Sequence, residues 1–92
     1  MLPSFHQAYF GDNVERQLFS RLEKLMEENP FFDLVTTGFS QGAALATICA
    51  SRYASLYPMM RVSCTVFGCP KIGDETWRNN IHSLPNLKVS LF

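Results

Sequence analysis

A serine between two glycines, in the segment Gly38-Phe39-Ser40-Gln41-Gly42, constrains the fold of this 92-residue chain more than any other feature. The β-type run Leu34-Val35-Thr36-Thr37 precedes it, and a helical run begins at Ala43. This is the strand–turn–helix context in which the pattern G-x-S-x-G makes a sharp turn whose serine hydroxyl projects free of the sheet. Gly38 and Gly42 are expected to keep side-chain bulk away from the crossing of strand and helix. The pattern therefore predicts a strained backbone at Ser40.

The place of Ser40, directly before a helix, also indicates its chemistry. The backbone N–H groups of a first helical turn point at the preceding residue, and the helix dipole favours negative charge there. The N–H of Gln41, one residue after the serine, is the expected donor to an oxyanion. Ser40 is therefore the candidate nucleophile of an acyl-transfer reaction, and the alternative is a serine in an ordinary turn.

Charge and cysteine content restrict the other functions that the chain could have. Eight basic and eight acidic residues give a formal net charge of zero, so no binding to nucleic acid or to an anionic membrane surface is predicted. No apolar stretch is long enough to span a bilayer, and contact with a lipid interface is left open. The spacings of Cys49, Cys64 and Cys69 fit neither a disulfide framework nor a zinc site. Three free, mostly buried thiols and no metal are expected.

The start of the chain favours a cytoplasmic location over secretion. Residues 1–6 lack both the basic and the apolar region of a secretory signal.

Strand-like and helix-like segments alternate along the chain. A first helix is expected after Asp12, with Glu15 completing a capping box, and is expected to stop at Asn29-Pro30. The segments expected to follow are a strand over 33–37, an alanine-rich helix over 42–56, a strand over 61–67, a helix capped by Asp74 that runs to His82, and a strand over 87–91. Alternation of this kind implies parallel strands in a doubly wound α/β sheet. About twice this length is needed to cover both faces of a three-layer hydrolase sheet.

Three segments resemble, in order and spacing, motifs of the fungal-type (class 3) lipases. His6-Gln7-Ala8-Tyr9 corresponds to the family's H-x-G-F segment. The run from Thr37 to Ala46 corresponds to its T-G-H-S-L-G-G-A-L-A elbow, and the run from Phe67 to Asp74 corresponds to its F-G-x-P-R-V-G-[ND] loop. Residues 1–92 thus resemble the central part of such a domain. The resemblance implies part of an α/β-hydrolase fold, with a parallel sheet of about three strands flanked by helices. It also implies hydrolysis of lipid or small acyl esters through a Ser–Asp–His triad without metal or organic cofactor.

The same resemblance implies that parts of the catalytic apparatus lie outside these residues. The family's upstream strand, which supplies part of the oxyanion hole, would precede them, and its triad aspartate and histidine would follow the strand at 87–91. We therefore expect a serine ester hydrolase as the parent domain, with the 92 residues inactive alone. Two alternatives remain. Gly-Phe-Ser-Gln-Gly is closer to the elbow of carboxylesterases and acyl-protein thioesterases, and the chain could be a non-catalytic, truncated lipase-like protein.

Other residues that could carry chemistry have simpler interpretations. Asp74 and His82 follow Ser40 in triad order, but we expect a helix cap and a solvated surface histidine. His6 matches a family histidine outside the triad, which indicates a structural or surface role. Cys69 is expected to fill space and not to act as a nucleophile, and Trp77 is expected in the core and not in a substrate wall.

Overall fold

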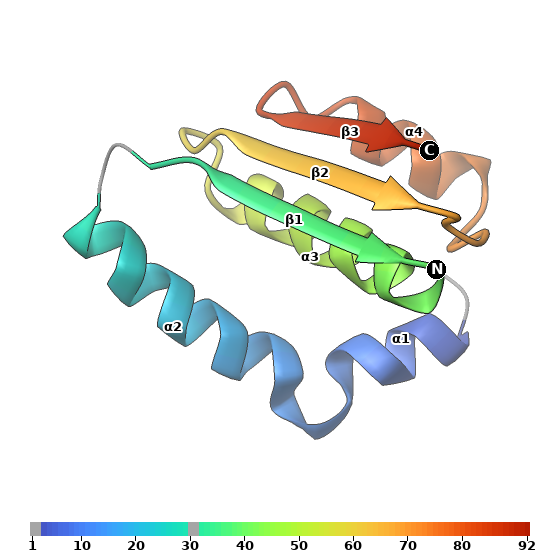
Figure 1. Ribbon diagram of the computed structural model, residues 1–92, viewed down its shortest axis with the longest axis horizontal. Helices are drawn as coiled ribbons and strands as arrows, with labels where there is room; N and C mark the ends of the chain where they lie inside the picture. The colour runs from blue at the N-terminus through green and yellow to red at the C-terminus, as the bar shows by residue number, and fades with distance from the viewer. Residues whose placement is uncertain (1–2, 30–31) are drawn as a thin grey trace.

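Three parallel strands form the centre of the protein, and their order in the sheet is the same as their order in the chain. The computed structural model describes residues 3–29 and 32–92. The strands are β1 (Leu34–Phe39), β2 (Val62–Phe67) and β3 (Leu87–Leu91), in the order β1-β2-β3. Val62 pairs with Leu34 and Leu87 at one end of the sheet, and Val66 pairs with Gly38 and Leu91 at the other, so the strands are aligned at both ends. A parallel α/β sheet of three strands flanked by helices is therefore confirmed (Figure 1).

Most predicted element boundaries are confirmed to within two residues. The helices are α1 (Pro3–Phe10), α2 (Val14–Glu28), α3 (Gln41–Leu56) and α4 (Glu75–His82), and a short 3₁₀ turn, η1 (Gly11–Asn13), joins the first two. The strand before Ser40 continues two residues beyond the predicted end, to Phe39. Helix α1 was not predicted.

Helix α3 packs closely on the sheet because its inner face carries small side chains. Ala43, Ala44, Ala50 and Ala54 are fully buried. A hydrogen bond of 3.1 Å from the Thr36 hydroxyl to the Ala46 carbonyl oxygen joins β1 to the helix. The predicted close approach of an alanine-rich helix to the sheet is thus confirmed.

The doubly wound arrangement is not found in the described residues. The strand order never reverses, and right-handed crossovers that step in one direction place their helices on the same face of the sheet. Accordingly, Thr47 of α3 and Ile81 of α4 line one cavity with Val89 of β3. Side chains that point the other way remain exposed, among them Val35 and Phe67. In Figure 1 the strands lie side by side in front of α3.

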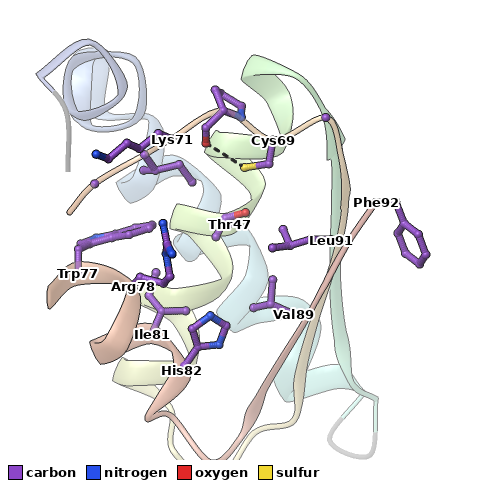
Figure 2. A pocket seen from close by; sticks show the side chains of 14 residues that line it. Thr47, Cys69, Lys71, Trp77, Arg78, Ile81, His82, Val89, Leu91 and Phe92 are labelled. Carbon is purple, nitrogen blue, oxygen red and sulfur yellow. Dashed lines mark hydrogen bonds between the residues drawn. The ribbon is translucent and has the colours of Figure 1, made fainter. Parts of the chain in front are cut away.

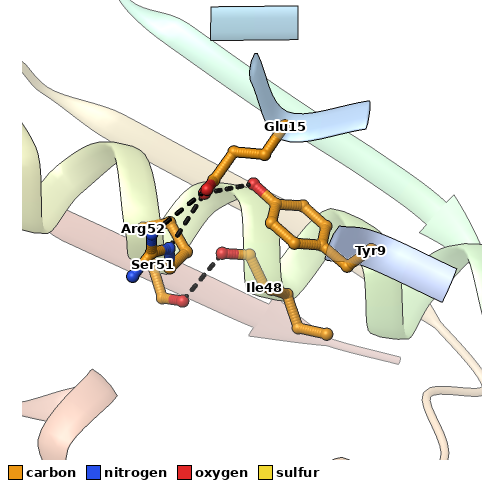
Figure 3. A network of polar contacts seen from close by, with 5 residues as sticks. All are labelled: Tyr9, Glu15, Ile48, Ser51 and Arg52. Atoms are coloured by element: carbon orange, nitrogen blue, oxygen red, sulfur yellow. Dashed lines mark hydrogen bonds and ion pairs between the residues drawn. The ribbon is translucent and has the colours of Figure 1, made fainter. Parts of the chain in front are cut away.

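The start of α2 differs from the predicted capping box. The residue that precedes the helix is Asn13, with a left-handed backbone (φ 59°), and not Asp12, which lies in the 3₁₀ turn. The Glu15 side chain instead accepts hydrogen bonds from the Tyr9 hydroxyl (3.0 Å) and from Arg52 of α3 (2.9 and 3.1 Å), as Figure 3 shows. Burial raises the pKa of the Tyr9 phenol above its ordinary value, which keeps this hydroxyl a donor. These contacts tie α1 and α2 to α3.

The side chain of Asn86 caps the C-terminal end of α3. The Asn86 amide donates to the carbonyl oxygens of Met60 (2.8 Å), Ala54 (3.0 Å) and Tyr57 (3.2 Å). The last carbonyl groups of a helix have no partner within it. Asn86 therefore joins the end of α3 and the turn after it to the segment that enters β3.

Candidate functional site

Ser40 lies between β1 and α3, in a backbone conformation that non-glycine residues seldom adopt. Its φ is 56° and its ψ is −119°. Strand β1 ends one residue earlier and α3 begins one residue later, at Gln41, so Ser40 lies between a strand and a helix as predicted. The N–H of Ser40 donates a 2.9 Å hydrogen bond to the Phe67 carbonyl oxygen at the end of β2. Strained backbone of this kind persists only where the surroundings enforce it and is concentrated at functional sites.

The two glycines around Ser40 have different roles. A Cβ atom at Gly38 would lie 2.4 Å from the Gly42 carbonyl oxygen and 2.8 Å from the Ala43 nitrogen, so no larger residue fits without moving the backbone. Among the described residues, a Cβ atom at Gly42 would meet nothing within 4 Å outside its own helix backbone. In this part of the chain, Gly38 is thus required for the close approach of strand and helix, and the expected steric role of Gly42 is not found.

The first turn of α3 presents hydrogen-bond donors next to Ser40. The first intrahelical bond runs from the Ala44 N–H to the Ser40 carbonyl oxygen (3.3 Å). The N–H groups before Ala44, including that of Gln41, therefore have no acceptor within the helix. Together with the helix dipole, they favour negative charge beside the Ser40 hydroxyl.

Asp74 and His82 do not form a pair that could activate Ser40. The Asp74 carboxylate accepts a 2.8 Å hydrogen bond from the Trp77 N–H and caps α4, as predicted. His82 is the last residue of the same helix and is exposed. At 1.5 Å per residue, the eight steps between them separate their backbones by about 12 Å. His6 is likewise exposed, with its ring 4.6 Å from that of Phe10.

The cysteines have the environment of inert thiols. Cys49 and Cys64 are buried and Cys69 is half-buried, all three unbridged, as expected. Burial raises the pKa of the Cys69 thiol, which disfavours the nucleophilic thiolate. Its Sγ lies 3.4 Å from the Pro70 carbonyl oxygen.

Sequence reasoning missed a row of aromatic rings beside Ser40. Phe39 is the register partner of Phe67, and the Phe67 and Phe92 rings stack with centroids 5.4 Å apart. We call Phe39, Phe67 and Phe92 the phenylalanine row. It crosses the carboxyl end of the sheet on the face opposite to α3, and Figure 2 shows Phe92 pointing away from the side chains on the helix face. The available signal was that Phe39 and Phe67 each end a strand of equal length.

The described residues contain neither a metal-binding cluster nor a membrane-spanning helix. Within 3–29 and 32–92, no group of three or more His, Cys, Asp or Glu side chains could hold a metal ion. In the same residues, no helix is long and apolar enough to cross a membrane.

Comparison with known proteins identifies a matching family and a relative of similar sequence. The family model described as lipase (class 3) matches residues 2–91. Phospholipase A1-IIdelta of Arabidopsis thaliana is 31% identical over 83 residues, which cover 84% of this chain and 20% of that protein. The chain thus spans about one fifth of the length of this curated relative.

Proposed function

The chain belongs to the class 3 lipase family, and from this premise we propose that it is the central part of a serine ester hydrolase that acts on acyl esters of lipids. The observation that supports the proposal most directly is the backbone of Ser40, held at φ 56° between β1 and α3. A serine in this turn presents its hydroxyl at the carboxyl edge of a parallel sheet, where an ester carbonyl can approach it.

In the proposed reaction, the Ser40 hydroxyl oxygen attacks the ester carbonyl carbon. The proton passes to a histidine that these 92 residues do not supply, and the carbonyl oxygen becomes an oxyanion. The N–H of Gln41 donates a hydrogen bond to that oxyanion, and the dipole of α3 stabilises its charge. Collapse of this intermediate, with transfer of the proton from that histidine to the leaving oxygen, releases the alcohol and leaves an acyl group on Ser40, which water then removes.

The missing base determines what the 92 residues do alone. Loss of triad members costs several orders of magnitude in rate, although oxyanion stabilisation leaves some residual catalysis. Without histidine and aspartate partners, the Ser40 hydroxyl has the nucleophilicity of an ordinary alcohol. We therefore propose that the activity belongs to the protein expressed from its complete reading frame. Because one relative is a phospholipase A1, phospholipid esters are the first lipid substrates to test.

The test compares the 92-residue chain with the protein from the complete reading frame. Hydrolysis of p-nitrophenyl butyrate and labelling by a fluorophosphonate probe are measured for both. We expect both signals only in the longer protein, where Ser40→Ala lowers kcat/KM by at least about a thousandfold. Ser55→Ala, which alters another exposed serine of α3, serves as the matched control.

Two results would contradict the proposal. One is stoichiometric labelling of Ser40 in the 92-residue chain, which would mean that a base within the chain activates it. The other is a Ser40→Ala protein that hydrolyses the ester as fast as the Ser55→Ala control.

A further inference from the structure

A cavity of about 720 Å³ lies on the helix-covered face of the sheet, between α3, α4, β3 and the loop after β2 (Figure 2). Its volume is within the range of small-molecule sites, roughly 300–1,000 Å³. Ser40 does not line it. The Ser40 turn adjoins the cavity at the end of β2, where the Phe67 carbonyl oxygen accepts the Ser40 N–H and Gly68 begins the cavity wall. The cavity is therefore a feature separate from the candidate nucleophile.

The interior of the cavity is apolar. Ile72 and Ile81 are buried, Trp77 is half-buried and packs against the core, and Leu91 is 63% exposed although it faces this space. The Thr47 hydroxyl, at the inner end, already donates a 2.8 Å hydrogen bond to the Ala43 carbonyl oxygen. An occupant of the interior therefore gains from burying apolar surface and not from hydrogen bonds. Trp77 was expected in the core; it instead packs against the core while half-buried and lines the cavity.

The outer part of the cavity is cationic. Lys71, Arg78 and His82 line it and are exposed, and none of the described residues that line it is acidic. The ion pairs found in the described residues join Glu15 to Arg52 and Asp33 to Arg61, away from this cavity. Two positive charges at an apolar cavity complement a ligand that has one anionic end and one apolar end.

We propose that this cavity binds a single-chain anionic amphiphile, with its chain against the apolar interior and its head group at Lys71 and Arg78. The choice of an acyl chain rests on the proposed function, whereas the need for an anion rests on the cavity alone. The head group is an oxyanion, either the carboxylate of a fatty acid or the phosphate of a lysophospholipid. Lysine and arginine bind both through charge-assisted hydrogen bonds.

Binding is measured by calorimetry on the Ser40→Ala variant of the protein from the complete reading frame, so that no hydrolysis occurs. Decanoate, decyl phosphate and decanol are titrated below their aggregation concentrations. We expect saturable binding of one anionic ligand per protein and at least about tenfold weaker binding of decanol. Octanoate should bind roughly tenfold more weakly than decanoate, because it buries two fewer methylene groups. Preference for the phosphate or the carboxylate head identifies which of the two sources the site accepts.

A pair of double variants tests the cationic residues. Lys71→Gln/Arg78→Gln should weaken binding of the anionic ligands at least tenfold, while leaving decanol unchanged. Arg21→Gln/Lys24→Gln removes two exposed cations from α2, outside the cavity, and should change neither. Equal binding of decanol and decanoate, equal effects of the two double variants, or no saturable binding would each overturn the proposal. Because the readout is binding by a Ser40→Ala protein, failure here is distinct from failure of the proposed hydrolysis.

Discussion

Substitution of Gly38 by alanine is the smallest change that tests how the chain forms the Ser40 turn. The added Cβ atom would lie 2.4 Å from the Gly42 oxygen, 2.5 Å from the Gly42 carbonyl carbon and 2.8 Å from the Ala43 nitrogen. All three neighbours are backbone atoms, so a change of rotamer cannot relieve the overlap. Ordinary contact begins at 3.4 Å, and β1 and α3 must therefore separate locally by about 1 Å, the difference between 3.4 and 2.4 Å.

That separation has an energetic and a functional cost. Overpacking of a rigid interior typically costs 1–3 kcal/mol. Because rigid backbone resists here, we expect Gly38→Ala to lower the free energy of unfolding by about 3 kcal/mol. A misplacement of 1 Å can cost about a hundredfold in rate, and Ser40 lies within the displaced turn. The folded fraction of the variant should therefore lose at least that factor in kcat/KM.

Gly42→Ala is the matched control, since its Cβ atom would meet nothing within 4 Å and its position is helical. Alanine there should be neutral or should stabilise the protein by roughly 0.4–1 kcal/mol. Urea unfolding followed by circular dichroism, with hydrolysis of p-nitrophenyl butyrate on the same samples, measures both effects in the protein from the complete reading frame. Equal stability and activity of the two alanine variants would refute the close-approach argument.

Three further predictions concern stability. The 92-residue chain alone should bind the dye ANS and aggregate, because the phenylalanine row is exposed on an open sheet face; a cooperative, monomeric transition at high temperature would contradict this. Hydrogen bonds from Arg52 lower the pKa of Glu15 in the folded protein. The pair therefore stabilises the fold at pH values above the ordinary carboxyl pKa, and this stabilisation is lost as the pH falls through the lowered pKa. The stability difference between the wild type and Arg52→Met should therefore shrink between about pH 6 and pH 3, and a constant difference would argue against it. Asn86→Ala should cost about 1–3 kcal/mol in urea unfolding because three carbonyl contacts are lost, whereas the exposed Asn80→Ala should cost less than about 0.5 kcal/mol.

The parts of the fold that could be predicted depend on signals local in sequence. The β-type run before Gly38, the alanines of α3 and the capping carboxylate of Asp74 each act within a few residues. Helix α1 has no such signal, and its Tyr9 is buried by packing in the core instead. The side of the sheet on which a crossover helix lies is likewise decided by strand order, which a local pattern does not contain. This explains why strand and helix alternation was predicted correctly, whereas the doubly wound arrangement is not found in the described residues.

The features of the candidate site also differ in whether a local sequence signal predicts them. The Ser40 turn could be predicted because Gly38, which permits the close approach, and Gln41, which begins the helix, lie within two positions of it. The hydrogen bond from its N–H to the Phe67 carbonyl oxygen joins a distant segment and could not. The cationic cavity joins a loop, a helix and a strand, so no single motif in the sequence indicates it. The phenylalanine row depends on strand register, which sequence segments some thirty residues apart do not reveal.

In the family's T-G-H-S-L-G-G-A-L-A elbow a histidine stands at the position of Phe39. Strand register explains why this difference does not weaken the interpretation of Ser40. Successive side chains of a strand point to opposite faces, and Phe39 points to the face away from α3, where it is 75% exposed. It lies next to the Phe67 position in register, and a Cβ atom at Gly68 would lie 3.9 Å from its ring. A change of residue 39 therefore alters the open face of the sheet. The Ser40 backbone is fixed from the other side, by the contact of Gly38 with Gly42 and by the hydrogen bond to the Phe67 carbonyl oxygen. The contacts that hold the Ser40 turn in the described residues thus do not involve the Phe39 side chain.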